Sequence, residues 1–135
     1  MKYFTIAELC RSNTGEKLGI ENVPNSFQKA NMENLINHLL DPIRQMWGKP
    51  IIVNSGFRCV KLNKAVGGAK NSEHMSGCAA DITTGNKADN KKLFDMIRNS
   101  SLEWRQLIDE SGSSWIHISY NQSDNKKQVL HLWNG

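Results

Sequence analysis

The order of its hydrophobic patterns is the feature that most constrains the fold of this 135-residue chain. Residues 26–47 repeat apolar side chains at helical spacing, and Pro42 interrupts them, so we predict a long helix with a kink or break and Asp41 as a new N-cap. Strand-like segments follow at 51–53, 78–83, 106–109, 115–120 and 129–133. Helices first and antiparallel strands later favour an α+β fold over a doubly wound sheet.

Shorter patterns place the remaining elements. Thr5 and Glu8 have capping-box spacing, which predicts a short helix that ends before Gly15, and the polar residues 13–25 indicate a loop. Two further helices are predicted, at about 62–66 and 87–99. The apolar face of the long helix is expected to comprise Phe27, Ala30, Leu35, Ile36, Leu39, Leu40, Ile43 and Trp47.

Length and composition limit the class of protein. A chain of 135 residues fits one domain, 1–135, and no stretch approaches the ~20 apolar residues of a membrane-spanning helix. Residues 1–5 lack an apolar signal core, so we expect synthesis in the cytoplasm. The three cysteines, Cys10, Cys59 and Cys78, are odd in number and form no C-x-x-C pair, which predicts neither a disulfide framework nor a thiolate zinc site.

The net charge of +4 does not indicate a nucleic-acid-binding protein. The basic residues form no run longer than a pair, and aromatic residues are not interleaved with them. We therefore expect no nucleic-acid partner and assign most of these charges to the solvated surface.

Two histidines and one carboxylate are candidate metal ligands. His74 lies in a loop and Asp81 on the following strand, and Gly77 permits a tight turn between them. Isoleucines alternate with His117 in the segment 115–119, so its ring should project from the face opposite the core. Two histidines and one carboxylate form a known catalytic zinc set. The alternative is that each histidine is an ordinary hydrogen-bonded or surface imidazole.

Several motifs resemble one family in order and spacing. They are Ser55-Gly56-Phe57-Arg58, Asn63, Gly67-Gly68, Ser72-x-His74, Gly77-x-Ala79-x-Asp81 and Trp115-Ile116-His117-Ile118-Ser119. The chain thereby resembles the zinc D-alanyl-D-alanine carboxypeptidases, which share their fold with the amino-terminal signalling domain of hedgehog proteins and include phage cell-wall lysins. The resemblance runs from about 24 to 120, with 1–23 as an N-terminal helix and loop. It implies an antiparallel sheet that carries the site, with helices on one side.

The resemblance also implies roles for individual residues. His74, Asp81 and His117 would bind one zinc ion. Arg58 would stabilise the developing oxyanion or hold a substrate carboxylate, as a planar, permanently charged group suits both tasks. Ser72 would hydrogen-bond within the site or to substrate. Cys78 should point away from the site by strand alternation, and Trp115 either walls the substrate cleft or packs in the core.

The general base is the position where the sequence departs from the family pattern. Many members carry an acid three residues before the last histidine, where this chain has Ser114. Hedgehog-like members use a glutamate about six residues before the last histidine, and Glu110 lies seven before it. We therefore favour Glu110 over Asp109 as the general base. A third possibility is that neither carboxylate acts as the base. Glu73 is expected to face solvent.

His131 is expected to be a partly buried strand histidine, with a supporting role behind the metal site as the alternative. Taken together, the resemblance implies a monomeric zinc metallopeptidase that hydrolyses peptide bonds at D-alanine in peptidoglycan, as a carboxypeptidase or a cross-link endopeptidase. A phage or prophage endolysin, which acts on the cell wall after release, is the expected origin. The alternative is a non-catalytic, zinc-stabilised module that binds peptidoglycan or protein.

Overall fold

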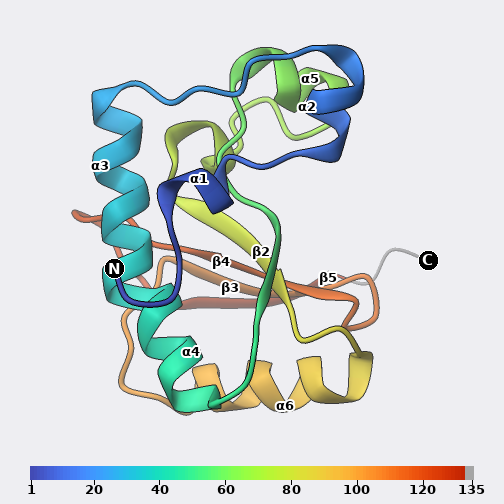
Figure 1. Ribbon diagram of the computed structural model, residues 1–135. Helices are drawn as coiled ribbons and strands as arrows, with labels where there is room; N and C mark the ends of the chain where they lie inside the picture. Colours follow the sequence, from blue (N-terminus) through green and yellow to red (C-terminus); the bar gives the residue numbers. More distant parts are fainter. Residues whose placement is uncertain (133–135) are drawn as a thin grey trace.

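A computed structural model describes residues 1–132 as an α+β fold around a five-stranded sheet (Figure 1). The strands are β1 (Ile52–Ser55), β2 (Ala79–Thr83), β3 (Gln106–Glu110), β4 (Trp115–Ser119) and β5 (Gln128–Leu132). The helices are α1 (Ile6–Leu9), α2 (Asn13–Leu18), α3 (Ser26–Leu35), the π-helix η1 (Ile36–Leu40), α4 (Asp41–Trp47), α5 (Val60–Ala65), the 3₁₀ helix η2 (Glu73–Ser76) and α6 (Lys87–Arg98).

The sheet has the strand order β1-β2-β4-β3-β5 and is mixed rather than wholly antiparallel. Neighbouring strands are antiparallel except β3 and β5, which run parallel, with Gln106 opposite Gln128. Strand β4 ends at Ser119, opposite the first residue of β3, and residues 120–127 carry the chain past that end to the other edge of β3, where β5 starts opposite Gln106. The α+β prediction is confirmed, and the last strand differs from the antiparallel arrangement expected for it. Residue 133 of that predicted strand lies outside the described residues.

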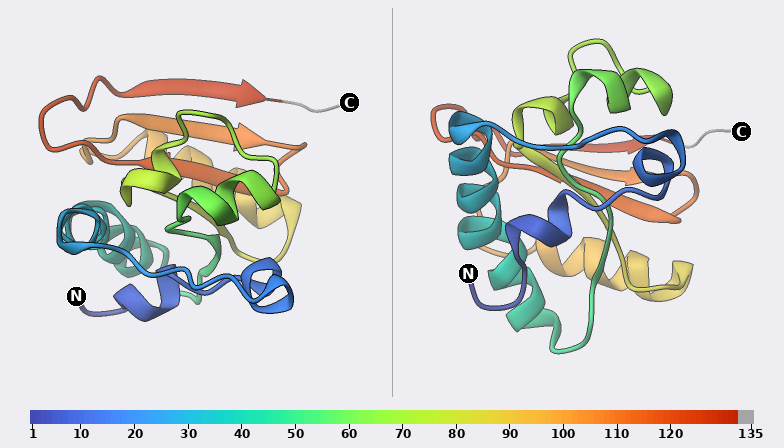
Figure 2. Two further views of the ribbon diagram at one scale, coloured as in Figure 1. Left: turned by 90° about the horizontal axis from the view of Figure 1, so that it is seen from above. Right: turned by 45° about the horizontal axis from the view of Figure 1, so that its top comes forward.

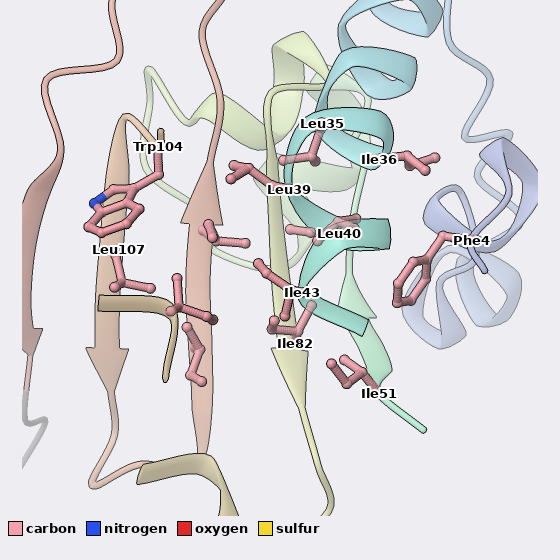
Figure 3. Close-up of a cluster of buried hydrophobic side chains, with 14 of the residues drawn as sticks. Phe4, Leu35, Ile36, Leu39, Leu40, Ile43, Ile51, Ile82, Trp104 and Leu107 are labelled. Atoms are coloured by element: carbon pink, nitrogen blue, oxygen red, sulfur yellow. The ribbon is translucent and has the colours of Figure 1, made fainter. Parts of the chain in front are cut away.

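One face of the sheet packs on the helices and the other carries polar side chains. Ile116 and Ile118 of β4 and Ile82 of β2 lie buried against the long helical segment α3–η1–α4, as Figure 3 shows for Ile82. Helix α6 packs against β3 and β4 on the same side and buries Leu93, Phe94 and Ile97, as predicted. Since side chains alternate along a strand, Asp81 and His117 point to the opposite face.

The long helix continues past Pro42 through a π-helical turn instead of breaking. A π turn accommodates proline, which has no N–H to donate within the helix. Asp41 does not cap α4; its carboxylate accepts hydrogen bonds from the backbone N–H groups of Lys2, Tyr3 and Phe4 and so ties the N-terminus to the helix. The predicted apolar face is right from Leu35 onward and wrong at Phe27, which is 71% exposed, and at Ala30, which is exposed as well.

The N-terminal segment contains two short helices where we predicted one helix and a loop. Thr5 caps α1 as predicted, with its Oγ1 accepting from Glu8 N at 3.1 Å. Ser12 caps the second helix, α2, and Gly19 ends it in the left-handed conformation. Figure 2 shows α1 and α2 as separate short helices. Strand β1 lies at the sheet edge with Ile52 54% exposed, so it is not the buried strand expected. No helix within residues 1–132 is long and apolar enough to span a membrane.

Candidate metal centre

His74, Asp81 and His117 converge on one point of the polar sheet face. Asp81 and His117 are direct partners in the β2–β4 register, and His74 approaches from η2. Asp81 Oδ1 lies 2.9 Å from His117 Nδ1 and 3.3 Å from His74 Nε2, and one ligand atom from each of the three residues lies within 4.8 Å of the others. The predicted ligand set is therefore assembled in the fold.

Local structure fixes the direction of the His74 ring. Ser72 caps η2 by accepting from His74 N at 3.2 Å, and Gly77 ends it in the left-handed conformation. A Cβ on Gly77 would clash with the carbonyl oxygen of Gln28, so glycine is required there. The His74 Nδ1–H donates to Gly56 O at 2.7 Å, which leaves Nε2 to face Asp81. The His74 side chain is only 3% exposed, and Nε2 is the ring nitrogen that it can present to a metal.

The electrostatics of the trio match a cation-binding site. Burial disfavours the charged forms of both Asp81 and His117. Hydrogen bonds from the two histidines nevertheless hold the pKa of Asp81 well below its usual range. Burial likewise lowers the pKa of His117, but the hydrogen bonds to Asp81 and Glu73 prevail and raise it to about 9. The site therefore attracts positive charge between the rings. Two imidazole nitrogens and one carboxylate oxygen are donors that fit zinc.

Arg58 lies beside this trio with its guanidinium partly buried. Its backbone N–H donates to His74 O at 3.1 Å, which places the residue next to the ligand loop. Burial lowers the pKa of Arg58, and the negative charges of Asp81 and Glu110 act against that shift. Its Nε is buried without a hydrogen-bond partner among the described residues. A buried donor without a partner, held near two carboxylates, is available to a ligand.

The space around Arg58 depends on the double glycine. A Cβ on Gly68 would overlap with Asn63 Oδ1 and would lie 3.1 Å from Arg58 Nη1. Asn63 is buried, and its Nδ2 donates to Ala69 O at 2.9 Å. Gly68 therefore leaves room for the side chains that pack behind the guanidinium.

Glu110 and Asp109 lie on opposite faces of the sheet. Glu110 pairs in register with Trp115, and the Trp115 Nε1–H donates to Glu110 Oε2 at 2.9 Å on the side of His117. The Glu110 charge is close enough to contribute to raising the pKa of both Arg58 and His117. Asp109 is buried on the other face, where its Oδ2 lies 3.3 Å from His131 Nδ1. His131 therefore lies on the face opposite the trio, and it does not take the supporting role behind the metal site that was its alternative.

The turn between β3 and β4 gives Glu110 and Trp115 their positions. Three consecutive residues, 111–113, have positive φ, a conformation that serine seldom adopts. Ser114 Oγ donates within the turn to Ser111 O at 2.6 Å. The buried side chain of Asn90 holds the turn from α6, since its Nδ2 donates to the carbonyl oxygens of Ser113 and Ser114 at 2.8 and 3.1 Å. Sequence reasoning missed Asn90, because it stands among the polar residues of an amphipathic helix.

Glu73 differs from its prediction. It does not face solvent freely: its side chain is 21% exposed, its Oε1 lies 3.9 Å from His117 Nε2, and its Oε2 lies 3.0 Å from Arg105 Nε. Arg105 in turn contacts Asp124. Cys78 lines a cavity together with Glu73 and Arg105, and it is not among the close group of metal donors in residues 1–132. No motif in the sequence marks Arg105, which follows a tryptophan in a segment without periodic pattern.

Two cavities lie next to residues that flank the trio, although none of the three candidate ligands lines either cavity. One, of about 460 Å³, is lined by Ser72, Glu73 and Arg105 among others. The second, of about 320 Å³, is lined by Ser55, Arg58 and residues of the N-terminal segment. The arrangement thus offers a candidate metal-binding trio with a carboxylate and a guanidinium nearby.

Two histidines and an aspartate that converge on one point, with a glutamate and an arginine nearby, define the class of metal-dependent hydrolases. The chain belongs to the peptidase M15 family, whose model matches residues 2–119. It is 43% identical over 84 residues to the zinc D-Ala-D-Ala carboxypeptidase of Streptomyces albus G. That match covers 62% of this chain and 32% of the relative, so it spans about a third of that relative's length. The resemblance drawn from the motifs is confirmed.

Proposed function

We propose that this protein is a zinc-dependent peptidase that hydrolyses peptide bonds at D-alanine in peptidoglycan stem peptides. The observation that carries the proposal is the convergence of His74, Asp81 and His117 on one point beside Arg58 and Glu110. Membership of the peptidase M15 family supports the reaction class. Similarity to a carboxypeptidase named for D-Ala-D-Ala supports the choice of D-alanine.

The three predicted ligands would hold the zinc ion through His74 Nε2, Asp81 Oδ1 and His117 Nδ1, the atoms that face one another. When bound, zinc supplies Lewis-acid polarisation of a carbonyl group and lowers the pKa of a water molecule. A set of three protein ligands leaves a further position open, as catalytic zinc sites do.

Glu110 is the proposed general base. Its carboxylate accepts the proton of the attacking water and returns it to the leaving amine when the peptide bond breaks. The Trp115 indole N–H, 2.9 Å from Glu110 Oε2, holds the carboxylate on the ligand face. Asp109 is unsuited to this role because it points to the opposite face, toward His131.

Arg58 is proposed to face the negative charge that develops on the carbonyl oxygen, or a carboxylate of the substrate. The guanidinium is a fixed cation in a partly dehydrated place, where electrostatic stabilisation is stronger than in water. Its buried Nε, without a partner among residues 1–132, supplies a donor for that purpose.

Ser72 and Trp115 are proposed to contact the substrate. Ser72 lines the cavity of about 460 Å³ next to Glu73, and Trp115 lies half-buried on the same sheet face as His117. The cavity of about 320 Å³ is lined by Arg58 and supports binding of part of the substrate next to the guanidinium. The proposed reaction is either cleavage of a cross-link between stem peptides or removal of a terminal D-alanine.

The proposed setting is bacterial cell-wall degradation by a monomeric enzyme of phage or prophage origin. The net charge of +4 supports attraction to an anionic wall.

A second candidate function is a zinc-stabilised binding module without turnover. Ser114 favours it, because a neutral hydroxyl stands where many family members carry the acid, and its Oγ is engaged with Ser111 O. The two functions make opposite predictions about hydrolysis and the same prediction about zinc binding.

Digestion of purified peptidoglycan by the zinc-loaded protein, read by mass spectrometry, tests the proposal. Glu110→Gln and a chelated sample are the controls. We expect cleavage at D-alanine that chelation abolishes and that Glu110→Gln loses while still binding zinc. Loss of one terminal alanine identifies a carboxypeptidase, and split dimers identify an endopeptidase. Unchanged muropeptides with the zinc-loaded protein would leave the binding module as the function.

A further inference from the structure

Each metal-facing histidine has a second ring nitrogen with a partner of its own. For His74 that partner is the backbone carbonyl of Gly56, 2.7 Å from Nδ1. For His117 the ring is turned so that Nδ1 faces Asp81 Oδ1 at 2.9 Å, and Nε2 therefore points away from the trio. On that far side stands Glu73 Oε1, 3.9 Å from Nε2.

Glu73 contacts Arg105, which in turn contacts Asp124. Its Oε2 lies 3.0 Å from Arg105 Nε, and Arg105 Nη1 lies 2.7 Å from Asp124 Oδ2. The backbone N–H of Arg105 donates to Ser119 O at 2.8 Å, so the arginine is anchored at the end of the strand that carries His117. Asp124, Arg105 and Glu73 thus form a continuous series of contacts that ends at a metal ligand.

We propose that Glu73 is a positioning residue that accepts a hydrogen bond from the Nε2–H of His117 and so presents the Nδ1 lone pair to the metal, with Arg105 and Asp124 fixing its carboxylate. The inference rests on the proposed zinc function. A shift of about 1 Å brings the observed 3.9 Å to the usual length of such a bond. A carboxylate behind a metal-bound histidine sets the tautomer and raises the basicity of the ligating nitrogen.

Other roles for Glu73 fit the geometry less well. The group of close metal donors in residues 1–132 comprises His74, Asp81 and His117 without Glu73. A surface pair would need only Oε2 to contact Arg105, whereas here Oε1 also faces His117 and Ser119 lies within hydrogen-bonding reach of the carboxylate. The proton-accepting role is the one proposed for Glu110, which pairs with Trp115 across the turn between β3 and β4.

The test compares Glu73→Ala, Glu73→Gln and Arg105→Ala with Glu33→Ala, an exposed glutamate on α3. Zinc affinity is measured by competition with a chelating dye, and the His117 tautomer by ¹⁵N NMR of histidine-labelled, zinc-loaded protein. We expect Glu73→Ala to weaken zinc binding about 10- to 100-fold and to change the His117 nitrogen signals. Glu73→Gln keeps an acceptor oxygen, so its zinc affinity and its His117 nitrogen signals should both stay close to those of wild type.

Arg105→Ala should change zinc affinity and the His117 nitrogen signals in the same direction as Glu73→Ala, but by less. It tests the inference even if Glu73→Ala does not fold. Zinc affinity within threefold of wild type and unchanged His117 signals in folded Glu73 variants would overturn the inference. Loss of hydrolysis with both readouts unchanged would also overturn it, since Glu73 would then act on the substrate directly. Failure of the proposed function looks different: wild type would show the expected tautomer and zinc binding but hydrolyse nothing.

Discussion

Asp81 Oδ1 lies 2.9 Å from His117 Nδ1, although 36 residues separate them in the chain, because the β2–β4 register makes them direct cross-strand partners. The backbone hydrogen bonds of two central strands thus fix the spacing of two proposed metal ligands. Sites built on strands hold their geometry better than sites built on loops. His74, the third proposed ligand, comes from a short 3₁₀ helix and depends on its own capping contacts.

Replacement of Asp81 by asparagine should remove one anionic ligand and leave two neutral imidazoles. We expect the loss of zinc affinity to exceed the roughly 10- to 100-fold typical of a change behind a ligand. The measurement is competition with a chelating dye, with Asp89→Asn at the exposed start of α6 as the matched control. Equal zinc affinity in the two variants would show that Asp81 is not a ligand.

Replacement of Glu110 by glutamine should lower kcat by about 10²- to 10⁴-fold, the usual contribution of a general base. Zinc affinity should stay near wild type, because Glu110 is not one of the three donors. Asp109→Asn is the matched control: it lies on the opposite face, so its effect should appear in the melting temperature rather than in kcat. Loss of kcat in Asp109→Asn with activity kept in Glu110→Gln would reverse the assignment.

Substitution of Gly68 by alanine should disturb Arg58 through Asn63. The added Cβ overlaps with Asn63 Oδ1, and overpacking of this kind costs about 1–3 kcal/mol of the free energy of unfolding. We expect a lower melting temperature and a reduced kcat/KM. Gly15→Ala is the control, since a Cβ there meets nothing closer than 3.5 Å and alanine favours a helix. Equal behaviour of the two variants would contradict the role given to Gly68.

Substitution of Asn90 by alanine should loosen the turn that carries Glu110 and Trp115. The carbonyl oxygens of Ser113 and Ser114 lose a donor, and each stranded buried group costs about 1–3 kcal/mol. Thermal unfolding should show the loss, while the exposed Asn37→Ala should be neutral. A melting temperature unchanged from wild type would mean that the turn holds itself.

Zinc binding should release a proton from His117. Its pKa in the metal-free protein is raised from 6.5 to about 9, so near neutral pH the ring is protonated and must lose that proton to bind metal. Apparent zinc affinity should therefore rise with pH up to about 9. Calorimetry at pH 7.5 in two buffers with different ionisation enthalpies measures the released protons, and equal heats in both would contradict the shift.

The same shift predicts how the metal-free fold responds to pH. A folded-state pKa above the unfolded value means that the Asp81–His117 pair stabilises the fold fully below about pH 6.5. This stabilisation should be lost as pH rises through about 9. The melting temperature of the chelated protein at pH 6.5 and at pH 9.5, compared with that of His117→Gln, checks the direction.

Much of the site was predictable because its signals are local. Gly77 marks the turn between His74 and Asp81, and the isoleucines around His117 show which face its ring takes. The choice of Glu110 was ambiguous by sequence distance alone. Strand alternation decides which face each carboxylate takes, but only once the strand boundaries are known.

The remaining features depend on long-range contacts that no local pattern reports. Glu73 meets Arg105 and His117 only when η2, β3 and β4 come together in the fold. Phe27 keeps helical periodicity with the core residues, yet in the first turn of α3 it stays exposed. The antiparallel direction predicted for β5 was wrong, because β5 pairs with β3 and not with β4, its neighbour in the chain, and no local pattern reports the order of strands.

The most direct test of the proposed function is the cleavage of a defined stem-peptide dimer by the zinc-loaded protein. The dimer is cross-linked through D-alanine and bears a terminal D-alanyl-D-alanine, and its cleavage is followed by liquid chromatography and mass spectrometry. Its diastereomers with L-alanine at those positions and a chelated enzyme sample are the controls. We predict cleavage on the carboxyl side of D-alanine with zinc-loaded protein alone, and no cleavage of the L-alanine peptides. An intact D-alanyl substrate after incubation with folded, zinc-loaded protein, or equal cleavage of both stereoisomers, would contradict the account.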